Sequence, residues 1–288
     1  MTTPRALPVA CSLILLSLPA FGQDREPFPV PFTVEHHVVD GTLGGPPIEG
    51  ETVKDTYGGS FLVSQRGDSS RTIVDFARRE VTEVRTDRGT YWTMSFGRWA
   101  ELRRRLETAE SDGVAAKAAT LSGAVKRAVR VEEIRDLVTR GSRTPAGATR
   151  SGLKRLRASV EGGPALEAWI DPAAPRLTAA GAAALADFER TVLGTGDGSV
   201  GAAELLDAIR SREGGALVVR TRRTVGTEPA AGAEGLVIED VVTKAEPVAS
   251  LPPALVSVPE GLRRVPSPLE VVVSWAEDEA ALRQRGRR

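Results

Sequence analysis

The sequence holds few of the side chains that usually carry chemistry. Its 288 residues include one cysteine, Cys11, two histidines, His36 and His37, and no asparagine. A single cysteine cannot form an internal disulfide. Neighbours on a β-strand point to opposite faces, so the two histidines would not serve one site together. A zinc site needs three convergent ligands, and a nucleophilic enzyme needs an activated nucleophile beside a base. We therefore expect no metal site, no cofactor and no enzymatic activity.

An excess of charge of one sign is also lacking. The chain has 38 Lys and Arg residues against 38 Asp and Glu residues, so no global field attracts nucleic acid or an anionic membrane. Aromatic residues make up only 5%, but an apolar content of 41% is enough for a core at this length. Most basic residues are arginines. We expect two groups of arginines, Arg103–Arg105 and Arg220 with Arg222 and Arg223, to form solvated faces rather than anion-binding sites.

A short apolar run marks the N-terminus. Arg5 precedes apolar residues from Ala6 to Leu18, and Pro19 and the segment Ala20–Gly22, which has small residues at its two ends, follow. This order is typical of a secretory signal peptide, so we expect residues 1–22 to be removed. The run is too short to favour a membrane span, and an uncleaved anchor is the rival interpretation. The mature chain would then have no cysteine and no transmembrane segment, and the protein would be periplasmic or secreted.

The region up to residue 96 is dominated by strand-like alternation of apolar and polar residues. Segments 32–40 and 51–65 are expected strands, and residues 70–96 read as three short strands joined by turns. The period then changes, because Trp99, Leu102 and Leu106 have the spacing of one helix face. These patterns predict an antiparallel sheet with one apolar face, followed by a helix.

The meander over residues 70–96 supplies the candidate apolar surface. Val74 and Phe76 share one face of the first strand, and we expect Val84 of the second strand to continue that face. Trp92, Met94 and Phe96 form a third row with period two.

Both helices and strands are predicted in the rest of the chain. Residues 109–152 form an expected insert, alanine-rich and helical at first and a polar linker at its end. The further strands are expected at 154–160, 166–171, 217–225, 236–245 and 269–275. The further helices are expected at 178–193, capped by Thr178, and at 202–212. We expect one α+β domain over residues 23–276 and a charged tail over 277–288.

A glycine-rich segment near residue 197 suggests two motifs and satisfies neither. Residues 196–201 match G-x-G-x-x-G, but a helix precedes them where a dinucleotide fold has a strand. Asp197, Gly198 and Glu204 have the spacing of half an EF-hand loop, but Leu193 and Thr195 stand where carboxylates are required. We expect an ordinary turn between helices. Asp75 and Asp171 are expected to mark turns rather than to act as acids or bases.

Several short motifs resemble a known family. The strands Ile73–Phe76, Val81–Val84 and Tyr91–Ser95 look like the central meander of exported bacterial proteins of the lipoprotein-carrier (LolA/LolB-like) superfamily. Glu167–Asp171 is similar to its tryptophan-bearing strand, and Leu251–Gly261 to a late segment of uncharacterised relatives. The resemblance implies a half-barrel, a curved antiparallel sheet with helices packed on its concave face. Carriers of the family bind acyl chains between the sheet and the helices.

Two functions follow as expectations. The first is a periplasmic binding protein that holds a lipid, an acyl chain or another apolar ligand, or handles a lipoprotein. The side chains expected to line its cavity are Val74, Phe76, Val84, Trp92, Met94, Phe96 and Trp169. The second is an interaction protein of the cell envelope in which the same side chains fill a core. The sequence leaves both open.

Overall fold

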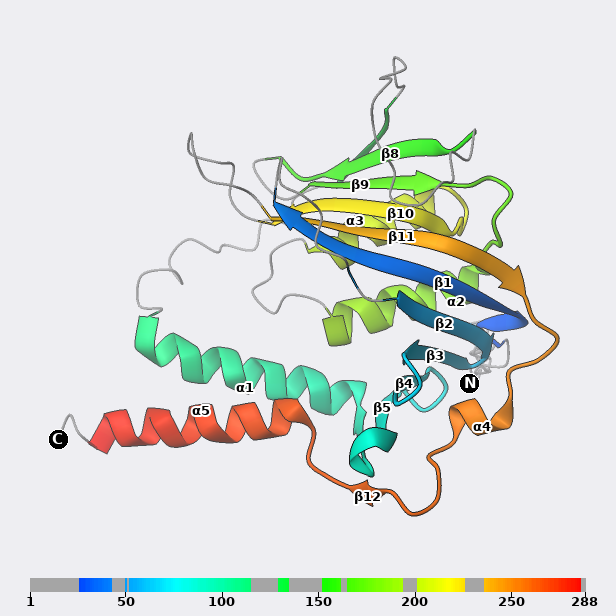
Figure 1. Ribbon diagram of the computed structural model, residues 1–288. Helices are drawn as coiled ribbons and strands as arrows, with labels where there is room; N and C mark the ends of the chain where they lie inside the picture. Colours follow the sequence, from blue (N-terminus) through cyan, green and yellow to red (C-terminus); the bar gives the residue numbers. More distant parts are fainter. Residues whose placement is uncertain are drawn as a thin grey trace, which may run out of the picture.

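The chain folds as an α+β structure around one large curved sheet (Figure 1). The computed structural model describes residues 26–42, 50, 52–114, 129–134, 152–161, 165–193, 201–225 and 236–285. The expected signal peptide and the expected linker at the end of the insert lie outside these residues. The sheet has 12 strands in the order β12-β6-β5-β4-β3-β2-β1-β11-β10-β9-β8-β7. Among the described strands, every pairing is antiparallel except that of β12 with β6.

The elements match most of the predicted pattern. The strands are β1 Phe28–Thr42, β2 Thr52–Gly59, β3 Phe61–Arg66, β4 Ser70–Asp75, β5 Glu80–Arg85, β6 Thr90–Ser95, β7 Arg130–Glu133, β8 Lys154–Ser159, β9 Ala165–Ile170, β10 Val218–Val225, β11 Leu236–Pro247 and β12 Arg263–Arg264. The helices are α1 Phe96–Val114, α2 Ala179–Phe188, α3 Ala202–Arg212, α4 Pro253–Val256 and α5 Pro268–Arg285. A 3₁₀ turn, η1, covers Thr86–Arg88, and a π turn, η2, covers Glu189–Leu193.

Local signals fix several boundaries. Thr178 caps α2 as predicted, since its hydroxyl accepts a hydrogen bond from the Gly181 amide at 2.9 Å. Asp75 marks a turn as predicted, since its carboxylate accepts the Arg78 amide at 2.9 Å. Asp171 does the same with the Ala173 amide at 2.9 Å. Both carboxylates therefore stabilise the turns that follow them by accepting backbone amides.

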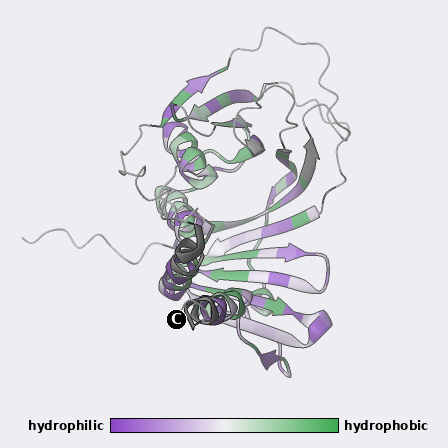
Figure 2. Cartoon of the chain, turned by 90° about the vertical axis from the view of Figure 1, so that its left-hand side faces the viewer, coloured by the Kyte–Doolittle hydropathy of each residue, from purple (hydrophilic) through white to green (hydrophobic). Residues whose placement is uncertain are grey.

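One face of the sheet, which we call the helix face, carries the largest apolar cluster. Side chains of β1–β6 on this face pack against Leu102 of α1, Phe188 of α2 and Val273 of α5. Towards the other end of the sheet, Leu166, Ala168 and Ile170 of β9 pack with Leu205 and Ile209 of α3. Figure 2 shows the helices along one side of the curved sheet.

The opposite, outer face of β3–β5 is covered by the chain that follows β11. Val63, Ile73 and Val84 are buried there beneath Leu251 and Leu255 of the α4 region. The chain then pairs with the edge of β6 through β12 and continues into α5, which packs on the helix face. This C-terminal segment therefore covers both faces of the same half of the sheet.

Residues 269–275, predicted as a strand, are instead the start of α5, so that prediction was wrong. The β-branched run Val271–Val273 favours strands, but tertiary packing decides here. Leu269 and Val273 lie one helical turn apart and both pack on the apolar cluster of the helix face. Ser267 and Glu270 form a reciprocal cap, with bonds of 2.8 Å from the Ser267 amide and 3.2 Å from the Glu270 amide. The helix passes residue 277, the expected start of the tail, without a break.

No helix in the described part of the chain combines the length and the apolar character needed to cross a bilayer.

Candidate functional site

Five of the seven predicted cavity residues lie together on the helix face. Trp92 and Met94 of β6 and Val74 of β4 are buried there, with Phe96 at the start of α1. Phe76 is half-buried against the same cluster. The structure thus brings these five side chains into one apolar surface, as the alternation predicted.

Ring contacts run through this surface. The ring centroids of Phe76 and Phe96 lie 6.2 and 5.6 Å, respectively, from the ring centroid of Phe188. Trp92 contacts Trp99 of α1 at 5.7 Å between centroids. Edge-on and tilted contacts at these distances are typical of packed aromatic cores. The rings therefore pack against helix side chains.

Val84 lies on the outer face, so the prediction that it continues the row of Val74 was wrong. The register pairs Val74 with Val81 and Arg71 with Val84. Val81 therefore shares the helix face, and Val84, three residues later, must point the other way. It is fully buried beneath the α4 region.

Trp169 also faces away from the apolar cluster. Its neighbours Ala168 and Ile170 point towards α3, which leaves the indole on the outer face between two guanidinium groups. The Cζ atoms of Arg155 and Arg220 lie 5.1 and 4.6 Å from the ring. Arg220 is also paired with Glu239 at 3.0 Å, so this member of an expected solvated group is a packed side chain.

A cleft of about 610 Å³ lies between α1, α5 and the paired edge of β6 and β12. Its size falls within the usual range of small-molecule sites. The apolar lining comes from Leu102, Val265 and Val273. Three arginines and two glutamates provide the charge: Arg98, Arg105, Arg264, Glu270 and Glu277. None of the seven predicted residues lines this cleft.

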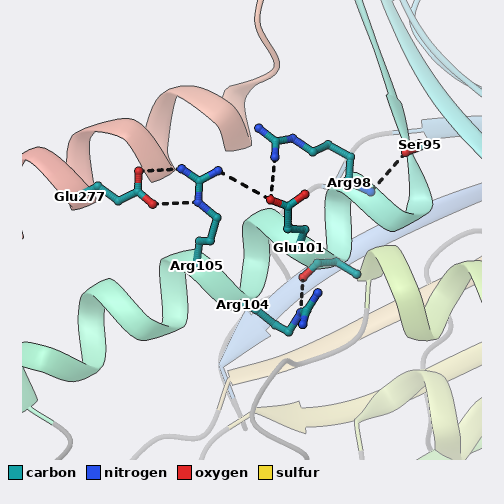
Figure 3. Close-up of polar contacts among 7 residues, drawn as sticks. Ser95, Arg98, Glu101, Arg104, Arg105 and Glu277 are labelled. Carbon is teal, nitrogen blue, oxygen red and sulfur yellow. Dashed lines mark hydrogen bonds and ion pairs between the residues drawn. The ribbon is translucent and has the colours of Figure 1, made fainter.

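A network of charges joins α1 to α5 along the cleft (Figure 3). Arg105 donates two hydrogen bonds of 2.8 Å to Glu277. Arg98 donates one of 2.9 Å to Glu101, which lies 3.9 Å from Arg105. The hydrogen bonds from Arg105 lower the pKa of the Glu277 carboxyl, so it is ionised at neutral pH.

Arg264 is the cation of the cleft that has no carboxylate partner in the described part of the chain. Its guanidinium reaches only the Thr93 carbonyl, at 3.4 Å. Glu270 already accepts the Ser267 amide as a helix cap. The lining carries three positive and two negative groups, and Glu101, which binds Arg98 beside the cleft, balances the third positive charge, so that Arg264 is the locally uncompensated group. The arrangement can attract an anionic group beside an apolar surface.

A second ionisable group of residues lies on the helix face where β1 passes between β2 and β11. His36 binds Asp240 at 2.8 Å and lies 3.4 Å from Asp55. Burial lowers the pKa of His36, but the two carboxylates outweigh it and raise the pKa to about 10. The imidazole therefore stays protonated at neutral pH and does not offer a base there.

His37 points to the other face, as predicted, with Nδ1 3.2 Å from the Thr52 hydroxyl. Among the described residues, no group of three histidine, cysteine or acidic side chains converges as metal ligands.

Glu204 accepts the Gly201 amide at 2.9 Å and so caps α3. The remaining glycine-rich positions before Gly201 lie outside the described residues.

The comparisons with known proteins are sparse. No family model and no curated protein matches the sequence. The solved structures with some likeness include PNGF-II in space groups P21 and C2, with TM-scores of 0.34 and 0.33 and identities of 10% and 11%. Each alignment covers 85% of this chain and 33% of the other, so the chain spans about a third of those chains. A likeness this low carries no argument about function.

A strand over residues 269–275 would leave the cleft without one of its walls, because that wall is formed by α5. A signal for the helix was present. Ser267, Pro268 and Glu270 have the spacing of a capping box with proline at the first helical position. No local signal pairs Arg105 with a partner 172 residues away.

Proposed function

We propose that the chain is an exported, non-enzymatic envelope protein that binds an amphiphile with an anionic group in the cleft between α1 and α5. The observation that carries the proposal is the position of Arg264. It is a cation with no carboxylate partner in the described residues, and it lines a cleft that also presents Leu102, Val265 and Val273. A fatty acid combines the two chemistries that this lining offers, an anionic group and an apolar chain.

The proposal places the ligand beside the apolar cluster of the helix face, not within the row of Trp92 and Met94. In it, the sheet is a half-barrel and α1, α2, α3 and α5 close its concave face. The support is that side chains of all four helices pack with residues of that face.

Calorimetric titration with two probes of equal chain length tests this function. We expect decanoate to bind and decyl maltoside, whose head is uncharged, to bind at least tenfold more weakly. Arg264→Gln should weaken decanoate binding by roughly tenfold, since a charge-assisted bond is lost. Arg88→Gln is the matched control, because Arg88 is exposed in η1 and does not line the cleft. Equal binding by both variants, or no binding by the parent, would refute the site.

A second candidate is an interaction protein with a filled core, which the ring contacts around Phe188 favour. Native mass spectrometry of protein purified from the cell envelope separates the two. A co-purifying amphiphile supports the binding protein. A clean unliganded mass, together with no uptake of decanoate, supports the interaction protein.

A further inference from the structure

The sheet edge beside the cleft is only partly paired. β12 pairs with β6 at Thr90 and Tyr91 and goes no further along that strand. Thr93 is the second residue beyond this pairing, and it lines the cleft. Because an unpaired edge presents backbone N–H and C=O groups, Thr93 can offer its backbone to a ligand.

The hydrogen bonds between β5 and β6 show which way the Thr93 backbone points. In an antiparallel pair, opposed residues alternate between those that bond to each other and those whose N–H and C=O groups point away. The Phe96 amide donates a bond of 2.8 Å to the Arg79 carbonyl, in the same register that sets Thr93 opposite Thr82. Counting back from Phe96, Met94 bonds to β5 and Thr93 does not. The amide and the carbonyl of Thr93 therefore both point out of the sheet edge.

The contacts of Thr93 agree with this orientation. Its carbonyl accepts the Arg264 guanidinium at 3.4 Å, and its hydroxyl lies 2.8 Å from that of Thr82. Within the described part of the chain, no backbone carbonyl accepts a hydrogen bond from the Thr93 amide. Since the N–H and C=O groups of one residue point the same way here, this amide lies beside the carbonyl that Arg264 contacts.

We propose that the head group bound in the cleft is a carboxylate, held jointly by the Arg264 guanidinium and the Thr93 backbone amide. This inference rests on the proposed function, which places an anionic amphiphile in the same cleft. A carboxylate has two oxygens, so it can accept one bond from each of these neighbouring donors. Both bonds are charge-assisted and therefore short and strong. Leu102 and Val273 provide apolar lining for the chain of the ligand.

The charges of the lining favour a head group with a single negative charge. Arg98 and Arg105 already bind glutamates, so Arg264 is the cation left for the ligand among the described lining residues. Glu270 has neutral partners, the amide and the hydroxyl of Ser267, and keeps its negative charge. A phosphate monoester carries about −1.5 to −2 at neutral pH, and Glu270 would repel the additional charge. The site therefore selects a carboxylate over a phosphate.

Amide NMR of the protein during a titration with decanoate tests the contact with Thr93. The Thr93 amide proton should move downfield by about 0.5 ppm or more as the charge-assisted bond forms. Met94, whose amide bonds to β5, is the internal control and should move by less than about 0.1 ppm. If Arg264→Gln weakens decanoate binding but the Thr93 amide of the parent does not move, this inference is overturned and the proposed function stands. If decanoate does not bind at all, the proposed function fails and takes this inference with it.

Two substitutions separate the Thr93 amide from the Thr93 side chain. Thr93→Pro removes the N–H at an outward-facing edge position, where proline is tolerated, and should weaken decanoate binding by about tenfold. Thr93→Val keeps the amide, loses the contact with the Thr82 hydroxyl, and should bind decanoate as the parent does. Circular dichroism checks that both variants are folded, and the amide shift in the parent decides the outcome if Thr93→Pro is not. Equal binding by two folded variants overturns the inference.

A second alkyl probe tests the choice of head group. Decyl phosphate has the same chain length class as decanoate, and it should bind the parent at least about tenfold more weakly because of its additional charge. Calorimetric titration at neutral pH gives the comparison. Decyl phosphate that binds as tightly as decanoate overturns the assignment of a carboxylate, while the proposed site for an anionic amphiphile stands.

Discussion

The guanidinium of Arg105 donates a hydrogen bond to each carboxylate oxygen of Glu277, and this pair of bonds joins α5 to α1. The two residues are 172 positions apart in sequence. Their geometry is bidentate, with both bonds at 2.8 Å, which fixes the rotation of α5 about its axis as well as its position.

Charge reversal at this pair should show that the contact orients α5. Arg105→Glu should lower the thermal midpoint of unfolding, because two carboxylates would then face each other, and Arg105→Glu with Glu277→Arg should recover most of the loss. The measurement is differential scanning calorimetry in low salt. A double variant that melts no higher than the single one would show that the contact does not contribute.

Trp92 should behave as a core residue rather than as the lining of an empty space. It is 7% exposed and packs against Trp99, so Trp92→Ala should cost on the order of 3–5 kcal/mol in denaturant unfolding. Tyr91→Ala, on the outer face of the same strand, controls for weakening of the strand and should cost less. Equal losses for the two variants would mean that the packing around Trp92 is not special.

His36 should stabilise the fold in a pH-dependent manner. Its pKa is about 10 in the fold against 6.5 in a free chain, so its stabilisation is complete below about pH 6.5 and is lost as the pH rises towards 10. His36→Gln removes this contribution, at a cost on the order of 1–3 kcal/mol near neutral pH, because the carboxylates lose a hydrogen-bonding partner. The difference in unfolding free energy between the parent and His36→Gln should shrink from pH 6.5 to pH 10. His37→Gln, at the neighbouring histidine that points to the other face, is the control for the loss of an imidazole from this strand.

Gly215 should tolerate no side chain. A methyl group there would collide with the carbonyl oxygen of Leu177. Leu177 cannot easily move away, because its amide donates a hydrogen bond of 2.8 Å to the Gly215 carbonyl. The backbone also has a φ of +77°, which other residues rarely adopt. We expect Gly215→Ala to cost more than Gly214→Ala, where φ is +64° but the nearest atom is the end of Arg176 at 3.5 Å. Denaturant unfolding of the two variants gives the comparison, and a smaller loss for Gly215→Ala would contradict it.

The sequence predicts those features of the fold that depend on residues close together in the chain. The alternation in β4–β6 and the cap of α2 by Thr178 are confirmed, because side-chain period and capping depend only on neighbours. The sequence does not reveal which of two apolar residues on β5 faces the helices. Val81 and Val84 cannot both do so, and the register that selects Val81 is set by pairing with Val74.

The cleft is harder to predict because every wall depends on long-range contacts. Its cations are spread over α1 and β12, and its carboxylates are both on α5. Composition favours reading the Arg103–Arg105 group as solvated. That interpretation fits the exposed Arg104 but fails for Arg103, which donates to the Val192 carbonyl at 2.7 Å, and for Arg105. Partners this far apart in the sequence are brought together by the order of the strands and helices, and no periodic pattern in the sequence marks them.

The placement of β1 has a consequence for how the chain is made. This 15-residue strand lies in the interior of the sheet, with β2 on one side and β11 on the other. Its second neighbour begins at Leu236, so the ribosome must add almost two hundred residues after β1 before that edge can be paired. Throughout this interval the nascent chain presents a long row of open amides and carbonyls, which other strands can join. A factor that shields this edge during synthesis would protect the half-made sheet from aggregation.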